Sequence, residues 1–327
     1  MGGDNAPEEI VAGAVLAATE GLGQMLLVGD EARIRPLLAG HPGLEIVHAP
    51  GAVAMDANPS HALRNADETS LGAAVNLVRD GRADAVVSAG NSGAFLAIAL
   101  VRLRPIAGVA RPAIAVVYPA KHGPVVVLDS GANVDCRPEW IAQFGVMGSA
   151  YARAVLRIAQ PKVGIISVGE ERVKGNAQTI EAARLLEATS VNFIGNIEGK
   201  DVLQNVADVC VTDGFVGNVM LKLCEGAASL IGDIVVHELK EGGPLTMLGA
   251  VLVRPALRRV REKLSYDSYG GAPLLGLRGN CIVAHGRANR VAVRSAIRAA
   301  VDEVRGDVVG RIAELIASSD IQEAKEA

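Results

Sequence analysis

The segment Val163-Gly164-Ile165-Ile166-Ser167-Val168 is a short apolar run. It leads into the polar loop Gly169-Glu170-Glu171-Arg172-Val173-Lys174-Gly175-Asn176 and then into a helical pattern. Similar runs, most of them β-branched, recur along the chain, and helical patterns separate most of them. This alternation predicts an α/β fold with a mostly parallel sheet and helices on both faces. The other predicted strands are Met25–Val28, Leu44–Val47, Ala85–Val87, Ala113–Val117, Val125–Leu128, Val209–Val211 and Cys281–Ala284.

Loops rich in Gly and Asn follow four of these strands, at Ser88–Gly93, Asp129–Asn133, Gly169–Asn176 and Thr212–Asn218. In open α/β sheets, ligands bind at the carboxyl ends of strands, where glycine permits close approach and helix N-termini attract anions. Each loop alone is more typical of an ordinary turn or helix cap than of a ligand site. Together they predict an anion site with these substrate-binding residues: Asn91, Ser92, Gly93, Asp129, Asn133, Gly175, Asn176, Asp213, Gly214 and Gly217.

The composition narrows the class of protein. Of 327 residues, 50% are hydrophobic, and the net charge of −4 argues against general nucleic-acid binding. The four cysteines form no C-x-x-C pair, and we expect them to be small buried residues. The start of the sequence shows no signal peptide, and no apolar run reaches the roughly 20 residues of a spanning helix. We therefore expect a cytoplasmic protein.

Several catalytic motifs are absent from the sequence. There is no G-x-G-x-x-G after a strand, no G-x-x-x-x-G-K-[ST], no G-x-S-x-G and no H-E-x-x-H. We therefore expect no nucleotide, no metal and no other cofactor, and no serine nucleophile. Among the histidines, only His285 follows a predicted strand, where it is either a structural residue or a catalyst.

The motifs also match a known family in their order along the chain. Besides the four loops, they are Gly2–Pro7, Gly195–Gly199, Gly270–Gly276 and His285-Gly286. The whole chain thereby resembles the bacterial PlsX-type phosphate acyltransferases, which move a fatty acyl group from acyl carrier protein to inorganic phosphate. The resemblance implies a three-layer α/β/α sandwich similar to the phosphotransacetylases. It also implies a cytosolic homodimer, bound peripherally to the membrane, whose acyl phosphate feeds a downstream glycerol-3-phosphate acyltransferase in phospholipid synthesis.

The resemblance carries one further expectation about the N-terminus. Members of the family usually have a strand and an aspartate directly before the segment that corresponds to Met1–Pro7. We therefore expect that a first strand is missing from this sequence. A missing central strand would leave a gap in a buried sheet.

Acyl transfer to phosphate needs no covalent enzyme intermediate, because phosphate is itself the nucleophile. The protein must hold phosphate against the thioester, stabilise the oxyanion and exclude water. We predict that Lys174 supplies positive charge, and that Asn218 or His285 donates a hydrogen bond. Lys174 is alternatively a solvated loop residue. Asp129 and Asp213 are expected to organise their loops, since a carboxylate near phosphate is repulsive.

A helical insertion is expected at about 240–266 within a single domain of residues 1–327. Leu245–Val253 is an apolar run, and Arg254–Lys263 contains four Arg and one Lys against one Glu. This pattern fits docking on an anionic membrane, docking of an acidic carrier protein, or a buried helix with solvated arginines. For membrane docking the candidate residues are Leu245, Leu248, Val251, Leu252, Arg254, Arg258 and Arg261.

Two other classes of function stay open from the residues alone. A nicotinamide- and metal-dependent dehydrogenase on a related fold would need acidic metal ligands and an adenosine-binding loop. A non-catalytic membrane-docking scaffold would leave the Gly- and Asn-rich loops unexplained. Acetyl-coenzyme A is an alternative acyl donor.

Overall fold

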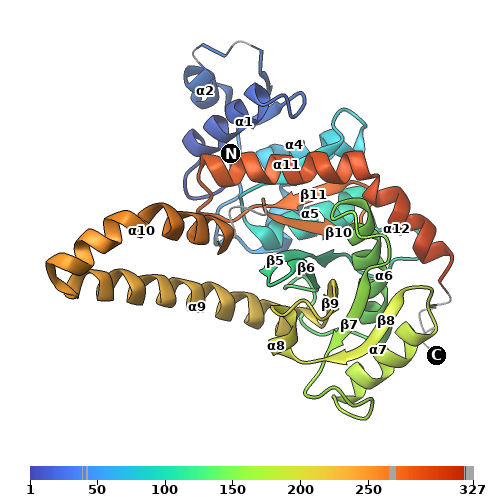
Figure 1. The fold of residues 1–327 in the computed structure, drawn as a ribbon. Helices are drawn as coiled ribbons and strands as arrows, with labels where there is room; N and C mark the ends of the chain where they lie inside the picture. The colour runs from blue at the N-terminus through green and yellow to red at the C-terminus, as the bar shows by residue number, and fades with distance from the viewer. Residues whose placement is uncertain (39, 42, 265–269, 320, 322–327) are drawn as a thin grey trace.

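The structure is a computed structural model that describes residues 1–327 apart from 39, 42, 265–269, 320 and 322–327 (Figure 1). The side chains of 244, 245, 247, 248 and 261–264 also lie outside the description. The strands form three sheets of two, four and five strands. Most strand pairs in them are parallel, as the sequence predicts.

The largest sheet lies in the lower part of the molecule in Figure 1. It consists of β5 (Val116–Ala120), β6 (Gly123–Leu128), β7 (Lys162–Ile166), β8 (Asn192–Ile197) and β9 (Val209–Val211), and its helices are α6 (Pro138–Ala154), α7 (Ala177–Glu187), α8 (Gly199–Val202) and α12 (Val308–Ala317). The strand order is β5-β6-β9-β7-β8, and only β5 runs antiparallel to its neighbour. Alternate residues face opposite sides. Val126 therefore packs in the core with α6 and α7, whereas Val127 packs in the core on the other face.

The second sheet contains β3 (Ala85–Ser88), β4 (Ala113–Ile114), β10 (Ala272–Leu275) and β11 (Asn280–Val283). Its order is β3-β11-β10-β4, and β10 runs antiparallel to both neighbours. The helices α1 (Glu8–Thr19) and α11 (Arg290–Gly306) cover one face, and α4 (Ser70–Arg79) and α5 (Ser92–Leu103) cover the other (Figure 1). A sheet between two helical layers is the predicted three-layer sandwich, which is thereby confirmed.

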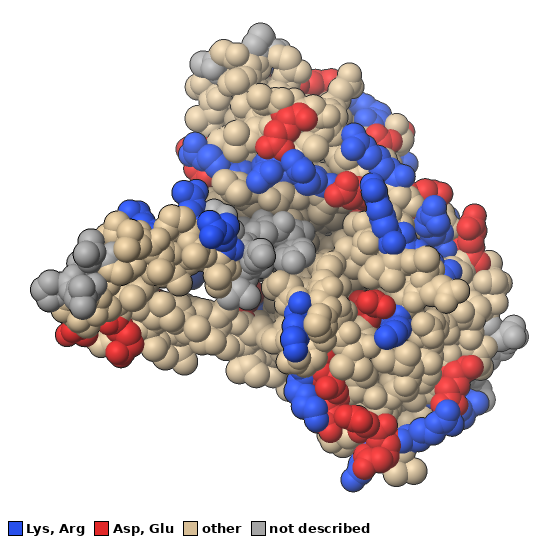
Figure 2. Space-filling model, viewed as in Figure 1, with Lys and Arg blue, Asp and Glu red and all other residues tan. Residues whose placement is uncertain are grey.

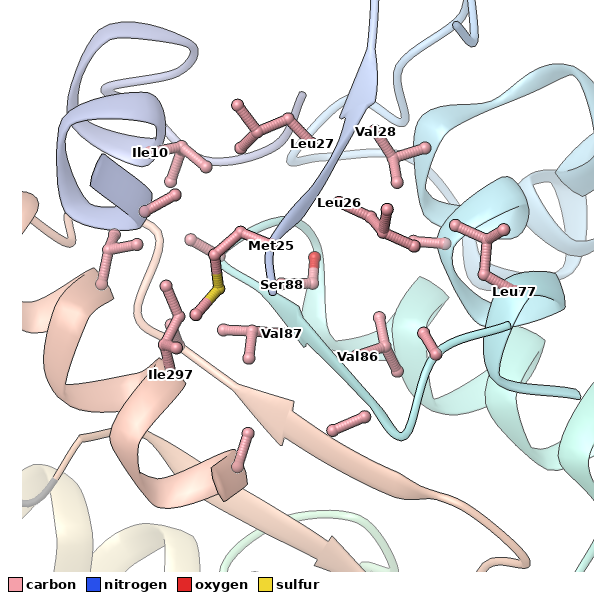
Figure 3. A pocket seen from close by; sticks show the side chains of 18 of the residues that line it. Ile10, Met25, Leu26, Leu27, Val28, Leu77, Val86, Val87, Ser88 and Ile297 are labelled. Carbon is pink, nitrogen blue, oxygen red and sulfur yellow. The ribbon is translucent and has the colours of Figure 1, made fainter. Parts of the chain in front are cut away.

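A smaller parallel sheet pairs β1 (Leu26–Gly29) with β2 (Glu45–His48). The short helices near it are α2 (Glu31–Ile34), η1 (Arg35–Leu38), α3 (Pro59–Arg64) and η2 (Ala66–Glu68). A cavity of about 730 Å³ lies between β1 and β3 (Figure 3). Most of its lining is aliphatic, as the labelled side chains of Leu26, Val87 and Ile297 show.

The sequence predicts one strand at Ala113–Val117, but the structure divides this run between two sheets. The N–H of Ala115 donates to the carbonyl of Pro273 in β10 (2.8 Å). The next residue, Val116, pairs with Val127 of β6. A continuous β-branched run carries no signal of this crossing, because the partners of each half are set by distant residues.

Two strands were not predicted from the sequence. β8 contains Gly195 and two asparagines, which are rare in strands, and β10 contains Pro273 and begins directly after a Gly-Gly pair. Pro273 is accommodated because its carbonyl, rather than an N–H group, forms the bond to Ala115. Tertiary pairing therefore overrides a weak local preference in both segments.

The helices α9 (Gly214–Glu241) and α10 (Gly243–Leu264) form a hairpin that projects from the body of the molecule (Figure 1). The predicted insertion at about 240–266 covers α10, and α9 supplies the second arm. Of α9, only Gly214 and Gly217 at its base are buried. Among the described residues, no helix combines the length and the apolar character that crossing a membrane requires.

Candidate active site

The carboxyl ends of four parallel strands are aligned at one edge of the five-stranded sheet. The register pairs Leu128 of β6 with Val211 of β9, and Ile166 of β7 with Ile197 of β8. The loops that follow these strands therefore emerge side by side. Three of the predicted site segments, at Asp129–Asn133, Gly169–Asn176 and Thr212–Asn218, lie at this edge.

Asp129 is the buried centre of the first loop. Its Oδ1 accepts from the main-chain N–H groups of Ile114 (3.0 Å), Gly131 (3.2 Å) and Ala132 (3.0 Å). Its Oδ2 accepts from the N–H (2.6 Å) and the Nδ2 (2.9 Å) of Asn133. Burial raises the pKa of Asp129, and the bonds from Ala132, Asn133 and Ile114 act in the opposite direction. Because all these partners are N–H donors, the carboxyl group organises its loop, as predicted, and has no free lone pair aimed at a ligand.

The loop after β9 packs directly on the Asp129 loop. The N–H of Asp129 donates to the carbonyl of Thr212 (3.0 Å), and the N–H of Gly214 donates to the carbonyl of Asn133 (2.8 Å). A Cβ at Gly214 would lie 2.8 Å from Oδ2 of Asp129. Only glycine allows the first turn of α9 to approach so closely.

The first turn of α9 presents its N-terminus at this edge. Asp213 caps the helix by accepting from the N–H of Val216 (2.8 Å). Asn218 follows in the next turn with an exposed side chain, and a Cβ at Gly131 would lie 3.5 Å from its Oδ1. The amide of Asn218 thus lies beside the Asp129 loop, where it can donate to a bound oxygen.

The third loop carries Lys174. Its carbonyl accepts from Oγ of Ser167 (3.1 Å) and from Nδ2 of Asn196 (3.1 Å). The Lys174 side chain is exposed and forms no ion pair with any residue that the structure describes. Gly175 follows with a φ of 122°, a conformation that favours glycine. Asn176 caps α7 by accepting from the N–H of Thr179 (2.8 Å), so its Oδ1 is engaged in the fold.

The fourth predicted loop, Ser88–Gly93, follows β3 in the four-stranded sheet. Nδ2 of Asn91 donates to the carbonyls of Met55 and Ala57 (both 2.9 Å), and its Oδ1 accepts from the N–H of Ala94 (2.9 Å). Asn91 therefore ties its loop to a preceding segment and caps α5. Substrate binding by its side chain stays a prediction, and these bonds leave its amide little capacity for it. Ser92 is exposed in the first turn of α5.

His285 belongs to the same group of loops as Ser88–Gly93. The N–H of Asp4 donates to the carbonyl of Gly286 (2.7 Å), and a Cβ at Gly3 would lie 3.0 Å from the carbonyl oxygens of Gly286 and Ala89. Nδ1 of the half-buried His285 accepts from the N–H of Arg287 (3.1 Å). Nδ1 is thus an acceptor, so the neutral ring carries its proton on Nε2.

Hydrogen bonds, close packing and strand pairing therefore place the predicted residues in three groups. One contains Asp129, Asn133, Asp213, Gly214, Gly217 and Asn218. The loop of Lys174, Gly175 and Asn176 lies at the same sheet edge. The third contains Asn91, Ser92, Gly93 and His285 on the other sheet. Sequence reasoning did not select Ser167 and Asn196, which hold the Lys174 loop, although Asn196 lies in the motif Gly195–Gly199.

Cys136 lies next to the Asp129 loop, where its Sγ contacts the carbonyl of Asn133 (3.4 Å). Burial raises the pKa of its thiol to about 12, so the reactive thiolate is scarce at neutral pH. The expectation of buried cysteines is met by Cys210 and Cys281, whereas Cys136 and Cys224 are half-buried. Within the described ranges, no group of three or more His, Cys, Asp or Glu side chains is arranged to hold a metal ion.

The sequence and the fold both have known relatives. Residues 1–311 match the family model described as "Fatty acid synthesis protein". The phosphate acyltransferase of Pelotomaculum thermopropionicum is 46% identical over an alignment of 327 residues that covers 99% of this chain and 95% of that protein. The phosphate acyltransferase of Desulforudis audaxviator is 46% identical over 313 residues, or 96% of this chain and 93% of that protein.

Two solved structures share the fold at low sequence identity. A phosphotransacetylase from Streptococcus pyogenes has a TM-score of 0.60 at 15% identity and covers 91% of both chains. A branched-chain phosphotransacylase from Enterococcus faecalis has a TM-score of 0.59 at 14% identity, covering 93% of this chain and 96% of that one. The sequence matches confirm the resemblance found in the motifs, and the chain belongs to the phosphate acyltransferase family.

Proposed function

We propose that this protein transfers a fatty acyl group from an acyl carrier protein thioester to inorganic phosphate, giving an acyl phosphate for phospholipid synthesis. Membership of the family supports acyl transfer to phosphate. The structural observation that carries the proposal is the edge of the five-stranded sheet. There the Asp129 loop, the exposed Lys174 and the N-termini of α7 and α9 all follow neighbouring parallel strands. Helix N-termini and a cation are what a phosphate dianion requires.

The reaction balances without a covalent enzyme intermediate. A phosphate oxygen attacks the thioester carbonyl, and a C–O bond forms in a tetrahedral oxyanion. The C–S bond then breaks, and the thiolate leaves and takes up a proton. The ammonium of Lys174 neutralises charge on phosphate and on the oxyanion, and preorganised charge of this kind is commonly the largest contribution to catalysis.

Two further groups complete the proposed catalytic set. Asn218 has an exposed amide beside Gly131, and it donates to the oxyanion or to phosphate. The Nε2–H of His285 is the alternative donor, from the loop on the other sheet. Asp129 is a positioning residue, because its two oxygens are occupied by main-chain and amide donors. Gly214 and Gly217 hold the first turn of α9 against the Asp129 loop, and Gly175 ends the Lys174 loop, so these glycines shape the proposed substrate site.

We infer that the projecting hairpin binds the surface of a membrane. On α10, the side chains of Val251 and Leu252 are 66% and 75% exposed, and Arg254 and Arg258 follow them. Basic side chains lie along this arm of the hairpin (Figure 2). Apolar side chains inserted shallowly, next to arginines that attract anionic headgroups, favour reversible binding. Leu245, Leu248 and Arg261, which belong to the same proposed surface, have side chains outside the described set.

The exposed apolar surface of α9 supports self-association. It includes Leu230, Ile231, Ile234, Val235 and Val236, which are between 37% and 60% exposed. Exposed apolar side chains in this number along one helix are typical of a protein interface. We propose a homodimer, formed in part by this face, that works in the cytoplasm at the membrane surface. Residues 1–327 act as one domain with the hairpin as an insertion, and the product serves a glycerol-3-phosphate acyltransferase.

One assay tests the proposed reaction. A long-chain acyl carrier protein is incubated with the enzyme, and release of free thiol is measured with and without phosphate. We expect phosphate-dependent release that survives dialysis against a chelator. A need for dinucleotide and divalent metal would favour the dehydrogenase, and vesicle binding without turnover would favour the scaffold. Running acetyl-coenzyme A in parallel identifies the donor class.

A further inference from the structure

The loop that carries Lys174 has little apolar packing of its own. Val168 and Val173 flank its tip with side chains that are 81% and 80% exposed. The residues Glu170–Lys174 are all exposed. A loop without buried side chains cannot be held by hydrophobic burial. Its conformation must therefore come from polar contacts to the neighbouring structure.

Apart from an ion pair between the exposed side chains of Arg172 and Glu187 (3.1 Å), the contacts of the loop converge on two carbonyl groups. The N–H of Lys174 donates to the carbonyl of Glu171 (2.9 Å), which closes a turn. Nδ2 of Asn196 donates to the same carbonyl of Glu171 (2.8 Å) and also to the carbonyl of Lys174 (3.1 Å). Oγ of Ser167 donates to the carbonyl of Lys174 as well (3.1 Å). One amide group thus bridges both ends of the turn, and one hydroxyl reinforces its second end.

Asn196 is itself held by the sheet. It lies in β8, where it pairs in register with Ile165 of β7. The next register pair joins Ile166 to Ile197, which is almost fully buried, and the N–H of Ser167 donates to the carbonyl of Ile197 (2.8 Å). The amide therefore extends from a fixed strand onto the loop, whereas the Arg172–Glu187 ion pair joins two exposed side chains and contributes little. It transfers the order of the sheet to the turn.

The backbone leaves few other ways to fix the turn. Gly169 begins the loop, and a Cβ there would lie 3.0 Å from Cγ of Lys174. Gly175 ends it with a φ of 122°. Glycines at both ends permit many backbone conformations. Bonds to the carbonyl of Lys174 are therefore needed to select the one conformation in which its side chain leaves the loop at a fixed place.

We propose that Asn196 is a positioning residue for acyl transfer: it clamps the Glu171–Lys174 turn and so fixes the ammonium of Lys174 at the phosphate site. The inference rests on the proposed function, since it assigns Lys174 to phosphate. Asn196 acts through the main chain of Lys174 and touches no substrate. Displacement of a positioned group by about 1 Å can cost about 100-fold in rate. Removal of the clamp is therefore expected to impair phosphate use selectively.

The test compares Asn196→Ala with Asn192→Ala, which lies in the same strand. Asn192 is exposed at the other end of β8 and donates to the carbonyl of Gln160 (3.4 Å). For Asn196→Ala we expect the KM for phosphate to rise about tenfold or more, with an unchanged KM for the acyl carrier protein. Asn192→Ala should behave as wild type in both. Equal kinetics of Asn196→Ala and wild type would overturn the inference.

A double-mutant cycle separates positioning from general destabilisation. If Asn196 acts through Lys174, adding Asn196→Ala to Lys174→Ala should cost less than twofold further in kcat/KM. An undiminished loss in the Lys174→Ala background would overturn the clamp. Asn196→Asp provides a second variant, because it keeps the shape but replaces both donors by acceptors that face carbonyls. It should lose at least as much as Asn196→Ala, and activity near the wild-type level would contradict the proposal.

The outcomes distinguish the clamp from the function on which it rests. If Lys174→Ala alone retains wild-type turnover, the assignment of Lys174 to phosphate fails, and the clamp fails with it. If Lys174→Ala loses activity and Asn196→Ala does not, only the clamp fails. Thermal unfolding of each variant shows whether a loss of activity follows a loss of fold.

Discussion

The main-chain oxygen of Asp129 lies against Gly217 so closely that a Cβ on Gly217 would overlap it. The first turn of α9 therefore packs so tightly on the Asp129 loop that no space is left for an additional carbon atom. We expect Gly217→Ala to displace the first turn of α9, to destabilise the protein by about 1–3 kcal/mol and to reduce turnover strongly. Chemical denaturation and the thiol-release assay measure the two effects.

Gly226 is the matched control for that substitution, since it lies in the same helix with no atom within 4 Å of an added Cβ. Gly226→Ala should leave activity unchanged and stabilise α9 by about 0.5–1 kcal/mol, because alanine favours a helix interior over glycine. Equal effects of the two substitutions would show that the close contact at Gly217 has no consequence.

Lys174→Ala tests the assigned cation. Removing one preorganised electrostatic donor commonly lowers the rate by about 100-fold to 1,000-fold. The fold should survive, because the side chain is exposed at the loop. Lys121→Ala removes another exposed positive charge, from the turn between β5 and β6, and should leave turnover unchanged. A folded Lys174→Ala variant with normal turnover would reject the assignment.

Glu303 is expected to make stability depend on pH. Its side chain is buried in α11, its Oε1 has no hydrogen-bond partner among the described residues, and burial raises its pKa well above the usual value. The folded protein then holds the proton while the unfolded chain releases it near pH 4. Stability is full below that pH and falls as the pH rises toward the folded-state pKa, by up to about 1.4 kcal/mol per pH unit.

Glu303→Gln removes this titration and should stabilise the protein at pH 8 more than at pH 4, as urea unfolding at the two pH values would show. Glu314→Gln, at an exposed position in α12, should leave the free energy of unfolding unchanged at both pH values. An identical shift at both pH values would mean that Glu303 is not held protonated.

Val251→Glu with Leu252→Glu tests the hairpin. Both side chains are largely exposed on α10, so the pair should fold normally. Two carboxylates on this surface should abolish sedimentation with anionic vesicles and leave soluble acyl transfer within about twofold, because insertion of apolar groups is lost and repulsion is added. Val101→Glu with Val206→Glu supplies the same charge on the body, where both side chains are also exposed, and should still bind vesicles. Unfolding of the hairpin variant would indicate a buried segment.

The features of the fold that the sequence predicts are those determined by the residues of each segment itself. Strands such as Val125–Leu128 were recognisable because buried parallel strands are rich in β-branched residues. The division at Ala115 and the strand containing Pro273 were not, because each depends on a hydrogen bond to the other across more than 150 residues. Local composition cannot report a partner at that distance.

In the candidate site, too, locally determined features could be predicted and contacts with distant segments could not. The glycines at 214 and 217 and the caps at Asp213 and Asn176 were visible as loop residues, and the structure gives each a contact. The occupied amide of Asn91 was not visible, since its acceptors Met55 and Ala57 lie in a segment without a motif. The role of Lys174 stays a prediction, because its exposed ammonium has no contact that identifies a ligand.

The strand order β3-β11-β10-β4 has a consequence for how the protein is made. β3 and β4 are synthesised first, and the two strands that lie between them, at 272–275 and 280–283, follow more than 150 residues later. The five-stranded sheet contains no strand beyond residue 211 and can assemble first. Until residues 272–283 have been synthesised, the nascent polypeptide carries two apolar strands without their partners in this sheet. Such intermediates are prone to aggregation and engage chaperones, so slowed translation of this segment should lower the soluble yield even when the finished protein is stable.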